Sequence, residues 1–296
     1  MYARKRNGKN GARLFDPALA NAAKNRAKIE SYVEAGLKED WFEAYLQPIL
    51  NLTTGRLTGL EALMRLIHPE HGIVPPSGIV QNAEETGAII RIGDRIFEKA
   101  VAQLARLTVH EEFKDVYVSV NISPLQFEPG LLDRMTLTLM RNGISPRNVV
   151  VEITEAVLMH HNPLIQQMLE GFGKAGYRLA LDDFGTGHCG FNYLKTLPID
   201  IIKIDQSFIR SLTEDGEIAR KKSRMLVEGI NTISHQMNCT VVAEGVEKAE
   251  QRDILADMGV DAGQGYLFSR PMPVDDIVEK YVLRVGRPAI SKQYAS

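Results

Sequence analysis

The sequence predicts an α/β protein folded as a modified (β/α)8 TIM-type barrel with one antiparallel strand. Three observations predict this fold. Short apolar segments alternate with amphipathic segments over about 245 residues, which is the size and rhythm of a barrel. Most of the apolar segments end at a polar residue, as strands do when a closed barrel gathers a site at one face. The first two strands are joined by a link too short for a crossover helix, so they should pair antiparallel.

The first 40 residues are predicted to precede the barrel. Residues 1–15 are basic and contain two Asn-Gly pairs, which favour a turn followed by a short strand. Asp16-Pro17 offers an N-cap and a first-turn proline, and helical spacing of apolar residues then predicts a helix over 17–38. We expect a tail over 1–15, a linker helix over 16–40, a barrel over 41–285 and a C-terminal tail over 286–296.

Eight strands are predicted in the barrel, near residues 43–49, 57–63, 116–121, 148–154, 177–183, 199–204, 239–244 and 261–267. The link between the first two runs from Asn51 to Gly55. Amphipathic stretches such as 93–107 and 216–236 predict helices between the later strands. In the second of these, the apolar stripe is read as Ile218, Met225, Ile230 and Ile233.

Composition narrows the functional class. A formal net charge of -2 gives no basic excess for binding duplex nucleic acid or an anionic membrane surface. No apolar run is long enough to span a bilayer, and the N-terminus lacks the apolar core of a signal peptide. Only two cysteines occur, Cys189 and Cys239, with no spacing for structural zinc. We therefore expect a soluble cytoplasmic protein, with inert cysteines and no membrane contact from this segment.

The stretch from Leu179 to Gly187 is the most informative part of the chain. An apolar strand runs into Asp182 and Asp183, and a glycine-containing turn follows. Neighbouring side chains on a strand point to opposite faces, so the two carboxylates can share a site only where the strand ends. Two such charges repel unless a cation lies between them or one is protonated. The alternative is that they cap a following helix.

Other predicted strands end in the same way, which favours a shared site over capping. The residues that would meet at the mouth of the barrel are Glu61, Asn121, Glu152, Asp182, Asp183 and Glu244. Five carboxylates and one amide oxygen are a hard ligand set, suited to Mg²⁺ or Mn²⁺. Five negative charges exceed what one divalent ion neutralises, so two ions bridged by a shared carboxylate are expected. Such a pair stabilises the attacking and leaving oxygens in phosphoryl chemistry.

Lys203 leaves several interpretations open. It could orient a nucleophile or neutralise charge at a reacting phosphate. It could instead form a structural ion pair with Asp205 or Asp183, or a Schiff base, although surrounding carboxylates disfavour the latter by keeping the ammonium charged. His160-His161 could bind metal and His188 could touch substrate, but solvated histidines are the simpler interpretation.

The motifs, taken together, resemble those of EAL-domain cyclic-di-GMP phosphodiesterases over about residues 40–285. Glu61-Ala62-Leu63-Met64-Arg65 is the motif that names the family. The other matching motifs, in family order, are Gln47-Pro48-Ile49, His68-Pro69-Glu70, Asn121-Ile122-Ser123, Glu152-Ile153-Thr154-Glu155, Asp182–Gly187, Lys203-Ile204-Asp205, Glu244-Gly245-Val246-Glu247 and Gln264-Gly265-Tyr266.

The resemblance implies roles for these residues. Two divalent cations would share Asp182, one held also by Glu61, Asn121 and Glu152, the other by Asp183 and Glu244. Lys203 would contact the nucleophilic water, with Asp183 and Glu244 also catalytic. Substrate would contact Gln47, Leu63 and Arg65. Glu155 would anchor the loop after Asp183, and Asp205, Glu247 and Gln264 would support the site. The implied reaction is two-metal, in-line hydrolysis of cyclic di-GMP to linear pGpG.

The resemblance also implies a homodimer, formed through the region after the paired aspartates. Two positions depart from the family pattern: Leu66 replaces a frequent tryptophan, and His188-Cys189-Gly190 replaces an aromatic-Ser-Ser sequence. The second departure bears on whether dimerisation is coupled to activity.

Residues 1–15 resemble the end of a GGDEF domain. The whole chain would then be the C-terminal part of a GGDEF–EAL protein, and Met1 would not be its natural start. Two alternatives to the enzyme remain. One is a catalytically silent cyclic-di-GMP receptor, and the other is a different barrel hydrolase or aldolase. The complete ligand set with Lys203 disfavours the first, and Gln47, Arg65 and the motif order disfavour the second.

Overall fold

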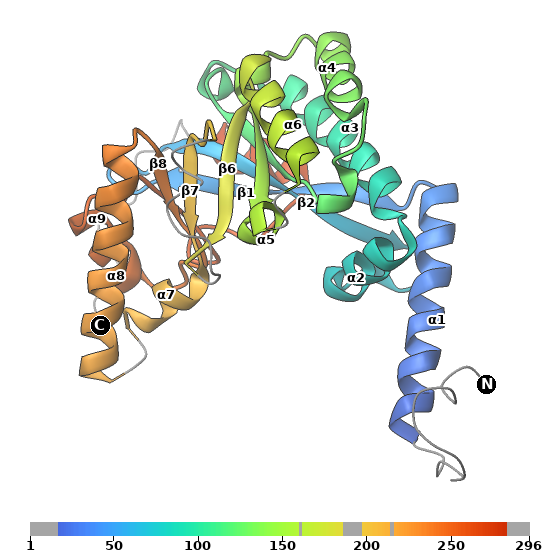
Figure 1. Ribbon diagram of the computed structural model, residues 1–296, viewed down its shortest axis with the longest axis horizontal. Coiled ribbons are helices and arrows are strands. Elements are labelled where there is room, and N and C mark those ends of the chain that lie inside the picture. Colours follow the sequence, from blue (N-terminus) through green and yellow to red (C-terminus); the bar gives the residue numbers. More distant parts are fainter. Residues whose placement is uncertain (1–16, 160–161, 186–196, 214–215, 283–296) are drawn as a thin grey trace.

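The computed structural model describes residues 17–159, 162–185, 197–213 and 216–282 (Figure 1). The predictions for residues 1–15 and 286–296, and those for His160, His161, His188 and Cys189, lie outside the described residues.

Eight strands close into a barrel, as predicted. In ring order they are β1 (Phe42–Asn51), β9 (Ala262–Gln264), β8 (Thr240–Ala243), β7 (Ile201–Ile204), β6 (Arg178–Phe184), β5 (Val149–Thr154), β4 (Tyr117–Asn121) and β2 (Leu57–His68), and β2 pairs back onto β1. β1 is antiparallel to both neighbours, whereas every other neighbouring pair in the ring is parallel. The prediction of one antiparallel strand is confirmed. A short strand, β3 (Gly72–Val74), pairs with β2 outside the ring and was not predicted.

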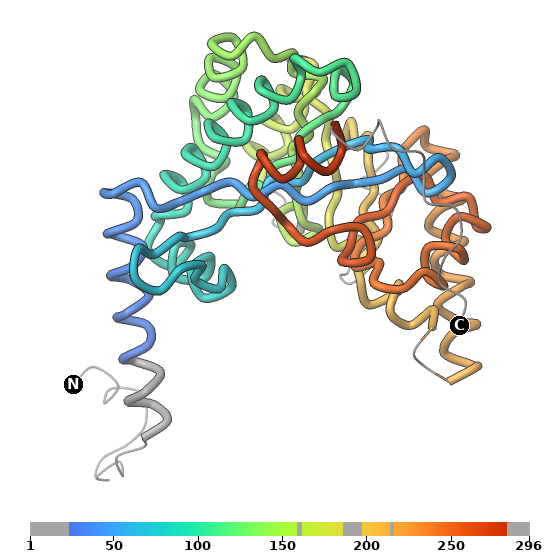
Figure 2. Tube along the Cα trace, turned by 180° about the vertical axis from the view of Figure 1, so that it is seen from behind, coloured from blue at the N-terminus to red at the C-terminus, as the bar shows by residue number. Residues whose placement is uncertain are grey.

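The helices surround the barrel. They are α1 (Pro17–Lys38), α2 (Pro76–Thr86), α3 (Ile89–Leu107), α4 (Leu131–Asn142), α5 (Glu155–Met159), α6 (Pro163–Lys174), α7 (Gln206–Ser211), α8 (Glu217–Gln236), α9 (Ala249–Asp257) and α10 (Val274–Tyr281). α3, α4 and α6 gather on one side, and α7, α8 and α9 on another (Figure 1). α1 runs beside α2 and extends beyond the barrel (Figures 1 and 2). Among the described residues, no helix combines the length and apolar character that crossing a membrane requires.

The apolar stripe of α8 differs from the predicted one. Ile218 and Met225 are 76% and 63% exposed. The buried side of the helix carries Val227 and Ile230 together with small polar residues such as Ser234. Ile230 is buried as predicted, but the prediction was wrong for Ile218 and Met225, because it assumed that every apolar residue of the helix would lie on the buried face.

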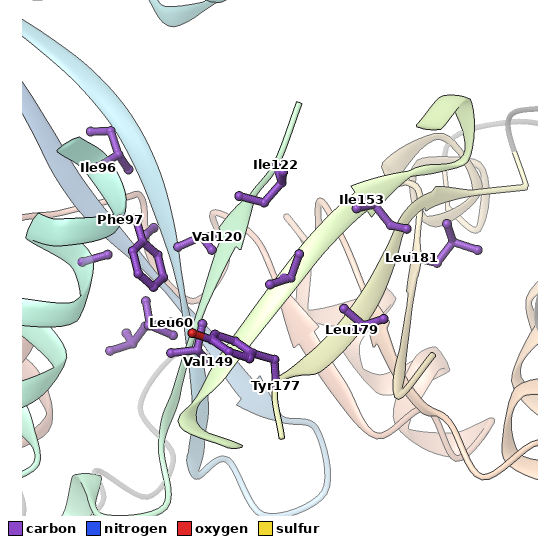
Figure 3. Packing of buried hydrophobic residues seen from close by; sticks show 14 of the residues in the cluster. Leu60, Ile96, Phe97, Val120, Ile122, Val149, Ile153, Tyr177, Leu179 and Leu181 are labelled. Atoms are coloured by element: carbon purple, nitrogen blue, oxygen red, sulfur yellow. The ribbon is translucent and has the colours of Figure 1, made fainter. Parts of the chain in front are cut away.

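Two apolar layers stabilise the fold. The outer layer lies between strands and helices, where Ile96 and Phe97 of α3 face Leu60 and Val120 (Figure 3). The inner layer fills the barrel with side chains from seven strands: Ile49, Tyr117, Val150, Ala180, Ile201, Val242 and Ala262. Burying such side chains contributes about 1.5–3 kcal/mol each for the larger ones.

Gly59 makes room for the largest of these inner side chains. A Cβ at this position would lie 2.3 Å from Cζ of the Tyr117 ring. We therefore expect Gly59→Ala to destabilise the protein by about 1–3 kcal/mol, because the buried ring has no free space to move into. Denaturant unfolding measures this change. The control is Gly229→Ala in α8, where a Cβ would contact nothing within 4 Å. Equal stability of the two variants would contradict the packing argument.

Candidate functional site

The alternation of side chains along each strand points several predicted site residues into the barrel, near one of its ends. Glu152, Lys203 and Gln264 each stand two residues beyond an inner-layer residue of the same strand, and so point to the same inward face. Gln47 on β1 stands two residues before its inner-layer residue, because β1 runs in the opposite direction. The site therefore lies at the carboxyl ends of the parallel strands, where barrel enzymes place their active sites.

Lys203 lies at the centre of the site. Its side chain is 1% exposed, and its Nζ is 2.7 Å from Glu244 Oε1, 2.9 Å from Glu152 Oε2, 3.4 Å from Asp182 Oδ1 and 3.5 Å from Glu61 Oε2. One ammonium thus faces four carboxylates: Glu61 on β2, Glu152 on β5, Asp182 on β6, and Glu244 directly after β8. These carboxylates carry more negative charge than the lysine neutralises.

A second chain of hydrogen bonds fixes Glu61. Asn121 Nδ2 donates to Glu61 Oε1 at 2.7 Å, and Gln264 Nε2 donates to Glu61 Oε2 at 2.5 Å. Gln264 Nε2 also donates to Gln47 Oε1 at 3.0 Å, and Gln47 Nε2 donates to the carbonyl of Ser269 at 3.1 Å. One oxygen of Glu61 is therefore held from β4 and the other from β9, the strands on either side of the β1–β2 pair.

Burial and neighbouring charges shift the pKa values of the site carboxylates in different directions. Burial raises the pKa of Glu152 well above its usual value and that of Glu244 to about 8, although Lys203 opposes both shifts. Burial would also raise the pKa of Glu61, but Lys203 and the hydrogen bonds from Gln264 and Asn121 bring it below its usual value. Burial alone would lower the pKa of Lys203, whereas the four carboxylates raise it well above its usual value. Lys203 is therefore charged at neutral pH.

The paired aspartates lie where the regular pleat of β6 breaks down, as predicted. The register between β6 and β7 shifts between Leu181 and Phe184, and Asp183 has a left-handed φ of 55°. Asp182 Oδ1 accepts the backbone N–H of Asp183 at 3.0 Å. As a result, Asp182, Asp183 and Glu244 each offer an oxygen within 4.8 Å of the other two. Burial and the charge of Asp182 raise the pKa of Asp183. The residues of a helix that these aspartates would cap lie outside the described residues.

Two of the predicted supporting residues, Glu155 and Asp205, make different kinds of contact. Glu155 Oε1 accepts the backbone N–H of Gly185 at 3.0 Å, directly after the paired aspartates. Asp205, by contrast, caps α7, accepting the backbone N–H of Ser207 at 3.0 Å. Its carboxylate is therefore committed to the helix, which removes the interpretation of Lys203 as its ion-pair partner.

Among the residues that the structure describes, two hollows flank the carboxylates. One, of about 250 Å³, is lined by Leu63, Glu244, Glu247, Gln264 and other residues that include Gln206 and Tyr266. The other, of about 380 Å³, lies between β2, β4 and helices α2 and α3, and its lining includes Leu63, Arg65, Asn121 and Glu152. Gln206 was not among the predicted site residues, and Tyr266 only as part of a motif. An exposed glutamine at a helix start and a tyrosine after a glycine carry no distinctive sequence signal.

The sequence matches the EAL domain family over residues 30–271. It is 33% identical over 279 residues to the bifunctional diguanylate cyclase/cyclic di-GMP phosphodiesterase MucR of Pseudomonas aeruginosa, covering 94% of this chain and 40% of MucR. The chain thus spans about two fifths of that relative.

Two solved structures share the fold. The EAL enzyme Bd1971, in a form with cAMP and cyclic-di-GMP bound, has a TM-score of 0.81 and 32% identity, covering 88% of this chain and 70% of that chain. The PaMucR phosphodiesterase in complex with c-di-GMP has a TM-score of 0.78 and 32% identity, covering 84% of this chain and 99% of that chain. The matched region includes every strand of the barrel and every residue of the site described above. The chain therefore belongs to the EAL domain family.

Proposed function

We propose that this protein is a metal-dependent phosphodiesterase that hydrolyses cyclic di-GMP to linear pGpG. The observation that carries the proposal is the gathering of an oxygen-rich ligand set around Lys203, between two hollows at the mouth of the barrel. The relatives with bound or named cyclic di-GMP support this choice of substrate.

The site fits divalent cations. Asp182, Asp183 and Glu244 supply converging carboxylate oxygens, and the four carboxylates around Lys203 leave an excess of negative charge. Hard oxygen donors of this kind suit Mg²⁺ or Mn²⁺. We assign Glu61, Asn121, Glu152 and Asp182 to one cation, and Asp182, Asp183 and Glu244 to the other. Such a pair activates water and stabilises the attacking and leaving oxygens of an in-line displacement.

The protein's own residues would do three things in the reaction. Lys203 would hold the nucleophilic water and offset charge at the reacting phosphate. Gln47, Leu63 and Arg65 would bind substrate at the rim, where Leu63 lines both hollows. Glu155, Glu247 and Gln264 would hold the site in shape, Glu155 by fixing Gly185 and Gln264 by fixing Glu61.

The two hollows also suit the shape of the substrate. Cyclic di-GMP carries two guanine bases on one central ring, which is built from two riboses joined by two phosphodiesters. We place the ring over the carboxylates and Lys203, with one base extending toward each hollow. The larger hollow offers the apolar side chains of Ile89, Ile92 and Phe97 to a flat base.

Arg65 provides a test of substrate binding. Its guanidinium is half-buried, lies over the Tyr45 ring and donates to the carbonyl of Met64 at 2.8 Å, so it is held at the rim before substrate arrives. We expect Arg65→Ala to raise KM for cyclic di-GMP about tenfold, with a smaller effect on kcat, because the contact forms with bound substrate as well as in the transition state. The control is Arg56→Ala, an exposed arginine in the β1–β2 link at the other end of the barrel. An unchanged KM would remove Arg65 from the substrate site.

The alternative functions require a different charge on Lys203 or fewer metal ligands. A Schiff-base aldolase needs a neutral lysine amine, whereas the four carboxylates keep Lys203 charged. A silent receptor would bind cyclic di-GMP without needing the complete ligand set. The completeness of that set favours the enzyme, and turnover separates the two.

We further propose that the protein acts as a homodimer, and that an upstream GGDEF domain joins α1 in the full-length protein. Residues 1–15 would be the end of that domain, 16–40 the linker and 286–296 a tail beyond the barrel. The match to a bifunctional cyclase/phosphodiesterase supports this organisation. Sedimentation velocity would test the dimer.

A further inference from the structure

The turn that follows Asn121 is tightly hydrogen-bonded. The backbone N–H of Ile122 donates to the carbonyl of Glu152 on β5 at 3.0 Å. Ser123 and Gln126 then form a reciprocal capping box. The N–H of Gln126 donates to the Ser123 carbonyl at 2.9 Å and also points at the Ser123 hydroxyl, and the Gln126 side chain accepts the N–H of Ser123 at 2.9 Å. Asn121 is thus the last residue of β4 and the first of a turn in which the Ser123 hydroxyl takes part.

Helices α2 and α3 hold this turn from outside the barrel. Gln126 is 3% exposed and packs against Gly93 of α3, where a Cβ would lie 2.1 Å from its Nε2. From α2, Glu84 Oε1 accepts the proton of Ser123 Oγ at 2.9 Å. A hydroxyl can donate only one hydrogen bond, and Ser123 donates it to the Glu84 carboxylate in a charge-assisted bond. The rotation of the hydroxyl is thereby fixed, and its lone pairs stay available to the Gln126 N–H.

We propose that Glu84 is a positioning residue for Asn121, acting through Ser123. Asn121 is the one neutral ligand in the proposed metal set, and its Nδ2 already donates to Glu61, which leaves Oδ1 as its ligand atom. A turn that shifts by a fraction of an ångström moves both contacts together. Hydrogen-bond partners that orient a metal ligand directly typically contribute 10–100-fold to metal affinity. Glu84 acts on Asn121 only through Ser123 and the backbone, so we expect an effect at the lower end of this range. The inference rests on the proposed metal site but not on turnover.

Mn²⁺ binding to the metal-free protein, followed by the electron paramagnetic resonance signal of free Mn²⁺ without substrate, tests the proposal. We expect Ser123→Ala and Glu84→Ala each to weaken one Mn²⁺ binding event about tenfold. The double variant should be no worse than Ser123→Ala alone, because that variant already lacks the bond to Glu84. Glu84→Gln should retain most of the affinity, since its amide oxygen still accepts from Ser123. The control is Glu85→Ala, the next carboxylate of α2, which pairs with Arg26 instead.

Three outcomes would overturn the proposal: unchanged Mn²⁺ affinity in both single variants, additive losses in the double variant, or losses that follow a lowered melting temperature in every variant including Glu85→Ala. The measurement is separable from the proposed function. A parent protein that binds Mn²⁺ but does not hydrolyse cyclic di-GMP would contradict the enzyme assignment and leave the role of Glu84 standing. A parent that binds no Mn²⁺ would contradict both.

Discussion

Replacement of Lys203 by methionine is expected to abolish hydrolysis of cyclic di-GMP and to destabilise the metal-free protein by about 3–5 kcal/mol. The side chain is fully buried among Glu61, Glu152, Asp182 and Glu244, so its loss leaves these carboxylates facing one another without a counter-charge. Protonation of the carboxylates with raised pKa values, such as Glu244, limits the loss of stability but also removes ligand charge.

Two measurements separate the structural and catalytic roles of Lys203. Denaturant unfolding of the variant in EDTA reports the lost charge pairing, and added Mn²⁺ should restore much of the stability, because the cations replace the missing positive charge. Hydrolysis should stay absent in the restored protein. The control is Lys99→Met, which breaks the ion pairs with Asp40 and Glu43 on the outside of the barrel and should cost less than about 1 kcal/mol. Turnover by Lys203→Met within tenfold of the parent would rule out the catalytic role.

Glu61→Ala is expected to lower turnover at least about 1000-fold, more than the loss typical of a residue that only supports a ligand. Glu61 supplies one carboxylate of the proposed metal set, and both of its oxygens are held by Asn121 and Gln264. Its removal deletes a ligand and also leaves the amide groups of Asn121 and Gln264 without their acceptor. Kinetic assays at saturating substrate and Mn²⁺ measure the loss.

The matched control for this variant is Glu43→Ala. Glu43 lies on β1 opposite Arg65 and pairs with Lys99 on the outside of the barrel. It should leave turnover unchanged. A Glu61→Ala enzyme with near-normal turnover would contradict the metal assignment, whatever the stability of the variant.

Much of the fold could be predicted because strand ends carry a strong local signal. Apolar runs that end at Asn121, Glu152 and Glu244 indicate both a strand and the end of it that faces the site. The short link before β2 indicates that β1 and β2 pair antiparallel. β3 was missed because three residues carry no periodicity. The first half of the α8 stripe was assigned wrongly because Ile218 and Met225 have helical spacing but lie on the exposed side.

The composition of the site was predictable, but its internal contacts were not. Sequence motifs place Lys203 and Gln264 in the site, yet nothing local shows that one ammonium meets four carboxylates, or that one amide joins Gln47 to Glu61. Those contacts depend on distances across the closed barrel. The left-handed Asp183 is similar, since a non-glycine residue in that conformation has no sequence signature and is fixed by the break in the β6–β7 register.

The most direct test of the proposed phosphodiesterase activity is the conversion of cyclic di-GMP by this protein in Mg²⁺ or Mn²⁺. Chromatography of pGpG follows the reaction, with EDTA and the Lys203→Met variant as controls. We expect pGpG formation that requires the metal and is lost in both controls. Tight binding of cyclic di-GMP without any turnover in either metal would contradict it and identify the protein as a receptor.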